Sequence, residues 1–270
     1  HPFAAPADQI ARYDGRDIPM PAHKGGVDAR FIPAPAATAI GEMDRYPAEV
    51  RRRLVLHYLA SISLIDDNVG RLLAALEETG QFEDTLILFT ADHGEFLGNH
   101  GLLRKPSLHY DETLRVPLLM RLPGGSAAGR RERGLVELTD VHPTLLGLLD
   151  IPVNDGVQGC DWSAALRAGQ PVGRDDIYSD MFDLASLRFG QPTGPYMAVQ
   201  TLRTEQWKLN VYPTAARPYG QLFDLHNDPE EARNRYADAD CREIREDLLW
   251  RLNSRVFRNT DPLPFYLTQY

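Results

Sequence analysis

The sequence has no long apolar run, little cysteine and no excess of positive charge. Because no stretch of about 18 apolar residues is present, no transmembrane helix and no membrane partner are predicted. The two cysteines, Cys160 and Cys241, could form one bridge, but their spacing does not require it. With 38 acidic against 29 basic residues the net charge is −9, which disfavours a nucleic-acid partner because phosphate binding needs a basic face. These absences leave a globular protein of ordinary composition.

The sequence offers little information about cellular compartment and assembly. No signal peptide is visible, and the chain starts at His1 rather than at a methionine. On these grounds a cytoplasmic location is preferred, and removal of a leader would instead indicate a periplasmic or secreted protein. An oligomer is compatible with the composition, which does not fix the oligomeric state.

One stretch, from Thr85 to Lys105, combines a buried-strand pattern with a dense group of polar and glycine residues. The apolar run 86–89 is long enough for one strand, and Asp92 and His93 follow it. The end of a buried strand is where an open α/β sheet places its ligand site. A carboxylate and a neutral imidazole are both ligands for a divalent cation, and Lys105 adds a mobile positive charge for an anion. A lone Asp-His pair would indicate only a polar surface loop, but the whole stretch favours a metal and anion site.

The order of these residues resembles that of the sulfatase family, within the wider alkaline-phosphatase-like superfamily. The matching segments are Thr90-Ala-Asp-His-Gly-Glu95, Gly98-Asn-His-Gly101, Lys105, Glu112-Thr-Leu-Arg-Val-Pro-Leu118 and, further along, Leu222-Phe-Asp-Leu-His-Asn-Asp-Pro-Glu-Glu231. So long a match in order is specific, and weaker similarity runs nearly from end to end of the chain.

The resemblance implies roles for five residues. Asp92 and His93 would be metal ligands, with Ca²⁺ the family's usual ion and Mn²⁺ or Zn²⁺ compatible with the imidazole. Lys105 would bind the sulfate group and stabilise charge during catalysis. His100, in the Gly-Asn-His-Gly segment, would touch the substrate or brace the metal site. His1, just ahead of a Pro-Phe pair, resembles a catalytic signature histidine displaced by one position.

The family's nucleophile signature is missing from this sequence. Sulfatases make a formylglycine nucleophile from the first residue of Cys/Ser-x-Pro/Ala-x-Arg. Cys160 has no arginine at the required position, and Cys241, which precedes Arg245 correctly, has Glu243 where proline or alanine belongs. The resemblance therefore implies the C-terminal portion of a sulfatase, whose nucleophile and further carboxylate ligands belong to a missing N-terminal part of the same protein.

The predicted fold class is α/β, with a central, mainly parallel sheet flanked by helices and a smaller C-terminal antiparallel sheet plus closing helix. Residues 1–45, rich in proline, alanine and glycine, are expected to be an extended, loop-rich segment. Residues 46–170 would be the C-terminal part of the α/β core and 171–270 an α+β subdomain. Within these, helical periodicity predicts a helix over 47–79 and another over 241–256, and short alternating runs predict an antiparallel meander over 176–225.

The function implied is a sulfuric ester hydrolase, which cleaves a small-molecule sulfate ester to an alcohol and sulfate. Two alternatives remain open from the sequence. One is a phosphonate monoester or phosphodiester hydrolase of the same superfamily, which shares the Asp-His and lysine pattern. The other is a non-catalytic fragment or subunit that binds a metal or an anion.

Overall fold

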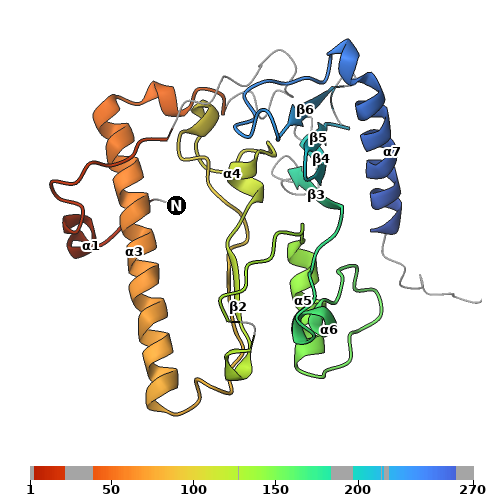
Figure 1. Cartoon of the computed structure of the whole chain (residues 1–270). Helices are drawn as coiled ribbons and strands as arrows, with labels where there is room; N and C mark the ends of the chain where they lie inside the picture. The colour runs from red at the N-terminus through yellow and green to blue at the C-terminus, as the bar shows by residue number, and fades with distance from the viewer. Residues whose placement is uncertain are drawn as a thin grey trace, which may run out of the picture. The chain divides into compact units, whose positions relative to one another are not determined.

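The computed structural model describes residues 3–21, 39–126, 128–183, 197–213, 215 and 219–259 (Figure 1). The chain divides into two compact units, His1–Ser126 and Ala127–Tyr270, which are described separately below as unit 1 and unit 2. The predicted boundaries after residues 45 and 170 stay predictions. None of the helices in the described ranges combines the length and the apolar character needed to cross a membrane.

Unit 1 contains helices and one pair of strands. In chain order its elements are α1 (Ala7–Ala11), α3 (Ala48–Glu78), β1 (Ile87–Thr90), α4 (Asp111–Leu114) and β2 (Leu118–Arg121), with 3₁₀ turns at Met43–Arg45, Asn99–Gly101 and Pro123–Gly125.

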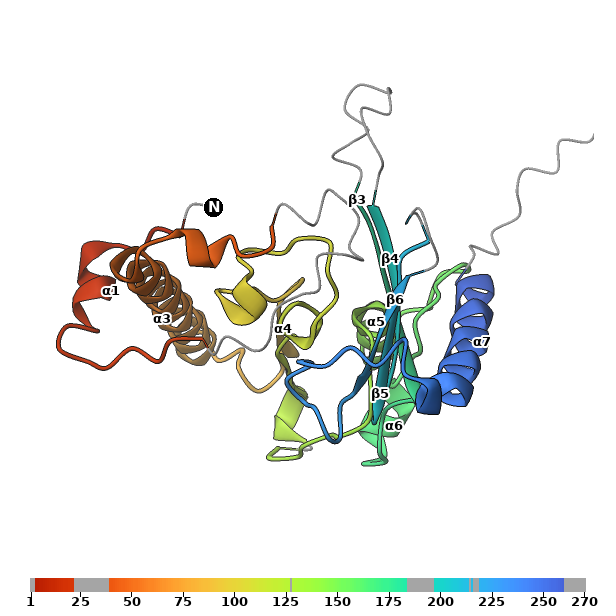
Figure 2. The same ribbon diagram turned by 90° about the horizontal axis from the view of Figure 1, so that it is seen from above.

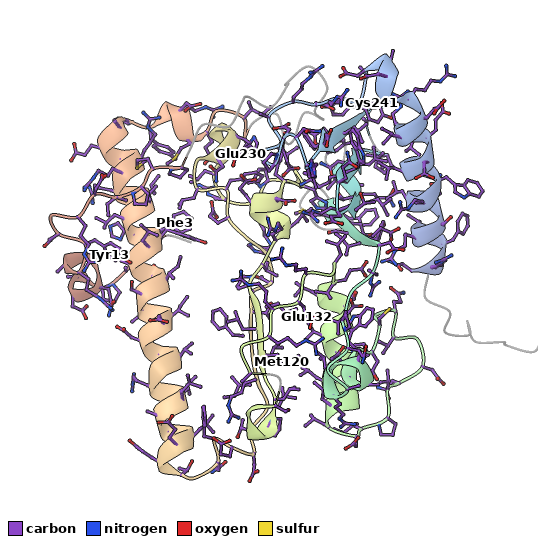
Figure 3. The ribbon with its side chains drawn as sticks, viewed as in Figure 1. Phe3, Tyr13, Met120, Glu132, Glu230 and Cys241 are labelled. Atoms are coloured by element: carbon purple, nitrogen blue, oxygen red, sulfur yellow. The ribbon has the colours of Figure 1, made fainter. Side chains whose placement is uncertain are left out.

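The long helix α3 confirms the helix predicted from periodicity. Pro47 is its N-terminal cap residue, and Gly80, just beyond its end, adopts a φ of +67° that favours glycine. The first half of the helix carries Val55, which packs in a cluster with Ile18 and Met43. Figure 3 shows Tyr13 beside α3, where the Tyr13 hydroxyl lies 2.6 Å from Oγ of Ser63.

Asp67 of α3 connects this helix to the segment that contains α1. Its Oδ2 accepts hydrogen bonds from Nε2 of Gln9 at 2.9 Å and from a guanidinium nitrogen of Arg12 at 2.8 Å. These bonds fasten the α1 segment to α3.

Strands β1 and β2 pair antiparallel, with Phe89 opposite Leu119 and Thr90 opposite Leu118. The strand predicted from the apolar run 86–89 is confirmed, and β2 begins directly after Pro117, which has no N–H to donate to a sheet. The central, mainly parallel sheet stays a prediction, because the only strand pair that the described residues of unit 1 form is antiparallel.

Unit 2 is built around a four-stranded antiparallel sheet. Its elements are α5 (Val141–Leu148), α6 (Ser163–Arg167), β3 (Asp176–Asp183), β4 (Met197–Thr204), β5 (Trp207–Val211), β6 (Gly220–Asp224) and α7 (Arg242–Arg258), with 3₁₀ turns at Leu138–Asp140 and Ala239–Cys241. The strands follow one another in chain order, β3-β4-β5-β6. Figure 2 shows α7 along one face of this sheet, so the predicted meander and closing helix are confirmed.

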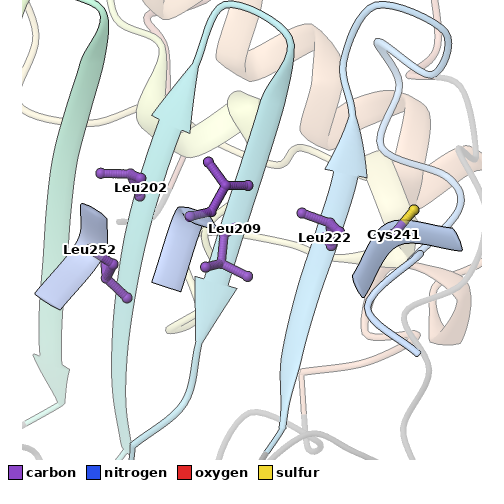
Figure 4. Packing of buried hydrophobic residues seen from close by; sticks show 6 residues of the cluster. Leu202, Leu209, Leu222, Cys241 and Leu252 are labelled. Carbon is purple, nitrogen blue, oxygen red and sulfur yellow. The ribbon is translucent and has the colours of Figure 1, made fainter. Parts of the chain in front are cut away.

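The core of unit 2 lies between the sheet and α7. Leu202, Leu209 and Leu222 come from three neighbouring strands and pack with Leu248 and Leu252 of α7 (Figure 4). Cys241 is buried in the same cluster, whereas Cys160 is exposed, and both thiols are free. No disulfide therefore contributes to the stability of the fold.

A network of ion pairs joins the start of α5 to the sheet and to α7. Asp140, the residue before α5, accepts the backbone N–H of Glu137 at 2.9 Å and pairs with Arg174. Glu137 in turn accepts the backbone N–H of Tyr178 at 2.8 Å and pairs with Arg174 and Arg255. These charges are largely buried, and each one has an opposite charge beside it.

Candidate active site

Asp92 and His93 lie directly after β1 and present two donor atoms to the same region. Oδ2 of Asp92 lies 3.5 Å from Nε2 of His93, and the Asp92 side chain is 85% exposed. Oδ1 of Asp92 accepts the backbone N–H of His93 at 2.9 Å, which fixes the orientation of the carboxylate. Asp92 and His93 therefore lie side by side at the end of β1, and Oδ2 of Asp92 faces the imidazole of His93.

The carboxylate of Asp92 is stabilised in its charged form. The hydrogen bond from the backbone N–H of His93 lowers the pKa of Asp92 most, followed by the charge interaction with His93 and, more weakly, with the Lys105 ammonium. Asp92, His93 and Lys105 therefore belong to one local electrostatic field. A carboxylate that is ionised well below neutral pH is suited to hold a cation.

The imidazole of His93 is oriented as a metal-binding histidine requires. Nδ1 of His93 lies 2.7 Å from the backbone oxygen of Gly94, a contact in which Nδ1 acts as donor and Nε2 is the nitrogen turned toward Asp92. Metal–oxygen bonds of about 2.3–2.6 Å place neighbouring donor atoms roughly 3.3–3.7 Å apart, which suits the Asp92–His93 spacing. These two residues therefore fit a divalent cation, and two donors form only part of its coordination shell.

Glu95 holds the loop that leads to Lys105. Its Oε1 accepts the backbone N–H of Leu97 at 3.0 Å and the backbone N–H of Arg104, the residue before Lys105. The backbone N–H of Phe96 donates to the Arg104 oxygen at 3.1 Å and closes the base of the same loop. Lys105 is exposed and directly follows Arg104, whose backbone Glu95 holds.

The loop from Gly94 to Arg104 depends on unusual backbone conformations. A Cβ at Gly94 would lie 1.9 Å from the backbone oxygen of Glu112 in α4, so only glycine fits there. Leu97, His100 and Arg104 have φ values of 49°, 55° and 66°, in the left-handed region that such residues rarely occupy. Backbone strain of this kind is concentrated at functional sites, where the surrounding structure fixes it.

His100 lies beneath the loop rather than on its surface. Its side chain is 2% exposed, and its ring packs on Tyr110 with ring centres 4.1 Å apart. Nε2 of His100 lies 3.5 Å from Oε2 of Glu112. This placement suits a residue that supports the loop, and its expected part in catalysis stays a prediction. His1, the other histidine predicted for the site, lies outside the described residues.

A second group of potential ligands lies in unit 2, where Asp238, Asp240 and Cys241 offer ligand atoms within 4.8 Å of one another. Arg235 already pairs with Asp238 at 3.2 Å and with Asp240 at 2.6 Å. Burial raises the pKa of the Cys241 thiol, which opposes the thiolate form that binds metals. These groups are satisfied by an arginine, and the Asp92–His93 pair is the better candidate.

Comparison with known proteins identifies the class to which this fold and site belong. The sulfatase family model matches residues 1–151, and the model for the C-terminal region of N-sulphoglucosamine sulphohydrolase matches residues 98–257. The chain therefore belongs to the sulfatase family, as its motifs predict.

Individual relatives include proteins of two named activities. The chain is 32% identical to the multifunctional alkaline phosphatase superfamily protein PehA of Trinickia caryophylli, over 93% of this chain and 53% of PehA. It is 30% identical to an arylsulfatase of Clostridium perfringens, over 78% of this chain and 42% of the relative. Among solved structures, the phosphonate monoester hydrolase of Silicibacter pomeroyi is similar with a TM-score of 0.78 and 29% identity, over 97% of this chain and 54% of that one. The chain spans about half the length of the curated relatives that it matches.

Proposed function

We propose that this chain supplies the metal-binding and sulfate-binding side of the active site of a sulfuric ester hydrolase. The observation that carries the proposal is the geometry after β1, where Oδ2 of Asp92 and Nε2 of His93 lie 3.5 Å apart. Lys105 contributes to the same electrostatic field. Membership of the sulfatase family supports sulfate esters as the substrate class.

Each residue of the site has a distinct role in this proposal. Asp92 and His93 hold the divalent cation, for which Ca²⁺ is the first candidate and Mn²⁺ or Zn²⁺ the alternatives. The bound cation would supply charge stabilisation to the ester group. Lys105 binds the sulfate oxygens and stabilises the negative charge that grows on them as the S–O bond breaks. Glu95 and His100 position the loop that carries Lys105.

The proposal assigns the nucleophile to polypeptide outside this chain. Neither cysteine stands in the sulfatase signature. Burial also raises the pKa of the Cys241 thiol, which makes the nucleophilic thiolate harder to form. A formylglycine nucleophile and further carboxylate ligands would come from the upstream part of the complete enzyme. The sulfate ester itself, a small molecule, is the expected substrate partner.

Variants of Asp92 and Lys105 separate the two proposed roles. They are placed in a chimera in which this chain replaces the matched region of the Clostridium perfringens arylsulfatase, so that the site is complete. Asp92→Asn should lower metal content and aryl sulfate hydrolysis together, because a neutral amide is a weaker ligand than a carboxylate. Lys105→Ala should lower the turnover rate about 10²–10³-fold while metal content stays unchanged, as removal of a charge-stabilising donor does. Metal content is measured by mass spectrometry of the purified protein, and Trp250→Ala, on the exposed surface of α7, is the control.

Unchanged metal content in Asp92→Asn would remove Asp92 from the coordination shell. Unchanged turnover in Lys105→Ala would remove the lysine from the sulfate site. A metal that binds normally in a chimera without any turnover would favour the non-catalytic alternative.

A second candidate function is the hydrolysis of phosphonate monoesters or phosphodiesters. The observation that favours it is the structural similarity to a phosphonate monoester hydrolase, at a TM-score of 0.78. Parallel assays on an aryl sulfate and an aryl phosphonate monoester distinguish the two functions. We expect the larger kcat/KM on the sulfate, and a larger value on the phosphonate would replace the first proposal with the second.

A further inference from the structure

Arg104, the residue before Lys105, has a side chain that its backbone does not require. The side chain is 53% exposed, and the φ of 66° lies in the left-handed region that favours glycine. The backbone is held on both sides, because its N–H donates to Oε1 of Glu95 and its oxygen accepts from Phe96 at 3.1 Å. Glycine would make the same two bonds without the strain of a left-handed residue.

One ion pair occupies only part of the Arg104 guanidinium group. Its Nη2 lies 3.4 Å from Oε1 of Glu42, whose side chain is 21% exposed. Among the described residues this is the one ion pair of Arg104, and its guanidinium group makes no hydrogen bond there. A partly exposed pair of this kind adds less to stability than a left-handed non-glycine residue costs. Several N–H donors of Arg104 are therefore available to a ligand.

The packing around Arg104 restricts where its guanidinium group can lie. Leu103, the preceding residue, is buried in one cluster with Met43, which directly follows Glu42. This cluster and the Arg104–Glu42 pair hold the loop against the 3₁₀ turn at Met43–Arg45. A side chain that is positioned before its ligand arrives loses less freedom on binding, so Arg104 is suited to recognition.

Arg104 lies within the charge field of the candidate active site. Burial raises the pKa of Glu95, and the charges of His93 and Arg104 both act against that rise. Lys105 acts weakly in the same sense on Asp92, whose pKa is lowered chiefly by the backbone N–H of His93. Two exposed positive side chains thus follow one another at the end of the loop.

We propose that Arg104 binds a second anionic group of the substrate, a carboxylate or a further sulfate, while Lys105 binds the sulfate group that is cleaved. The inference rests on the proposed function and narrows its substrates to sulfate esters that carry two negative charges. The planar N–H donors of a guanidinium group match paired oxygen atoms of an oxyanion. Because the chain has a net charge of −9, a doubly charged substrate needs positive charge in the site itself.

The simpler alternative is that Arg104 only fastens the loop through its pair with Glu42. The two roles predict different results for variants of the two residues. If Arg104 only fastens the loop, removing either partner should affect every substrate alike. If Arg104 binds the substrate, its loss should affect only doubly charged esters, and loss of Glu42 should release the guanidinium group to bind them better.

The test measures kcat and KM in the chimera with the upstream portion of the Clostridium perfringens arylsulfatase. The substrates are 4-nitrophenyl sulfate, the same ester with a carboxylate on its ring, and 4-nitrocatechol disulfate. Arg104→Gln should raise KM about 10–100-fold for an ester with the second group that Arg104 binds, and leave KM for 4-nitrophenyl sulfate unchanged. A loss on one of the two doubly charged esters alone identifies the carboxylate or the sulfate as that group.

Further variants separate substrate binding from effects on the fold. Glu42→Gln should lower KM for the doubly charged ester, and Arg104→Lys, which keeps the charge, should recover part of the loss. Arg104→Gly should show the same loss as Arg104→Gln without a fall in Tm, because glycine removes the strain. Arg51→Gln is the matched control, since Arg51 is 37% exposed and pairs with Asp44 at 3.7 Å, and it should change no KM.

Binding of two inert sulfonates to the chimera, benzenesulfonate and 4-sulfobenzoate, is measured by calorimetry to judge Arg104 without turnover. We expect tighter binding of 4-sulfobenzoate, and Arg104→Gln should remove the difference. Equal affinities for the two sulfonates, or equal losses on all three esters in Arg104→Gln and Glu42→Gln, would overturn the inference. If the chimera binds 4-sulfobenzoate more tightly through Arg104 but hydrolyses no sulfate ester, the proposed function fails and the second anion site stands.

Discussion

Glu95 is the residue at which the geometry and the charge of the site are most closely connected. Its carboxylate accepts two backbone N–H groups and so shapes the loop that ends at Lys105. Burial raises the pKa of Glu95 even though those N–H groups and the charge of His93 act in the opposite direction. The Glu95 carboxyl group therefore fixes the loop, although its burial there makes it harder to ionise.

The raised pKa of Glu95 predicts a pH dependence of stability in the metal-free chain. Because the folded state holds this proton more tightly than the unfolded state, the free energy of unfolding should fall as pH rises from the ordinary glutamic acid pKa, about 4.3, through the raised pKa of Glu95. Urea unfolding at a series of pH values measures this slope. Glu95→Gln, which keeps a hydrogen-bond acceptor but cannot ionise, should flatten it, and an unchanged slope would assign the effect to another group.

The two cysteines should differ in reactivity. Cys160 is exposed, whereas Cys241 is buried in the core of unit 2 and burial raises the pKa of its thiol. Iodoacetamide should therefore alkylate Cys160 in the folded chain and Cys241 only after unfolding, as peptide mass spectrometry would show. Rapid modification of Cys241 in the folded chain would contradict its place in the core.

Sequence motifs identified Asp92, His93 and Lys105 as candidates because their order along the chain is distinctive. The same motifs do not reveal that His100 is buried, since its burial depends on Phe96 and Tyr110, whose rings pack around it in the folded loop. The bracing role of Glu95 was also not predicted. It depends on a hydrogen bond to a residue nine positions away, and side-chain orientation of that kind has no local signal.

At the scale of elements, unit 2 is held together by charges as well as by apolar packing. Glu137 is 8% exposed, accepts the backbone N–H of Tyr178 of β3, and pairs with Arg174 and with Arg255 of α7. The residues that meet here are far apart in the sequence. Periodicity could predict the meander and α7, but it could not predict which charged residues would join them.

Loss of Glu137 should be strongly destabilising. Glu137→Ala leaves the partly buried guanidinium groups of Arg174 and Arg255 without one of their acceptors, which should lower the free energy of unfolding by about 3–5 kcal/mol. Glu83→Ala is the matched control, because Glu83 is 70% exposed and pairs with Arg121 at 2.9 Å on the surface. Its loss should cost about 0–1 kcal/mol in chemical denaturation. Equal losses in the two variants would mean that the buried network adds nothing beyond a surface pair.

The loop after β1 depends in the same way on the fit between two elements. The backbone of Gly94 approaches α4 so closely that Gly94→Ala should move the loop and lower stability by about 1–3 kcal/mol or more. Gly124→Ala is the control, since no atom lies within 4 Å of a Cβ placed there. Its φ of +67° favours glycine, so alanine should lower stability there too, but by less than at Gly94. Thermal unfolding compares the two, and a larger loss at Gly124 would contradict the close approach at Gly94.

At the scale of the whole molecule, the chain has a complete core in unit 2 and exposed apolar surfaces in unit 1. The core around Leu209 and Leu252 is fully buried, whereas Phe89 and Leu119 of the strand pair that leads to Asp92 are exposed. The sequence indicated that part of the site is missing, because the motifs for the metal and the lysine are present and the nucleophile signature is not. The sequence could not indicate which apolar side chains of unit 1 would be exposed, since their exposure depends on how α3 and the strands pack.

The most direct test of this account is a comparison of aryl sulfate hydrolysis by the chain alone and by the chimera with the upstream portion of the Clostridium perfringens arylsulfatase. We expect no turnover above background for the chain alone. We expect measurable turnover for the chimera that depends on Asp92 and Lys105. Hydrolysis by the purified chain alone, at a rate that Asp92→Asn does not change, would contradict the claim that this chain carries one side of a shared active site.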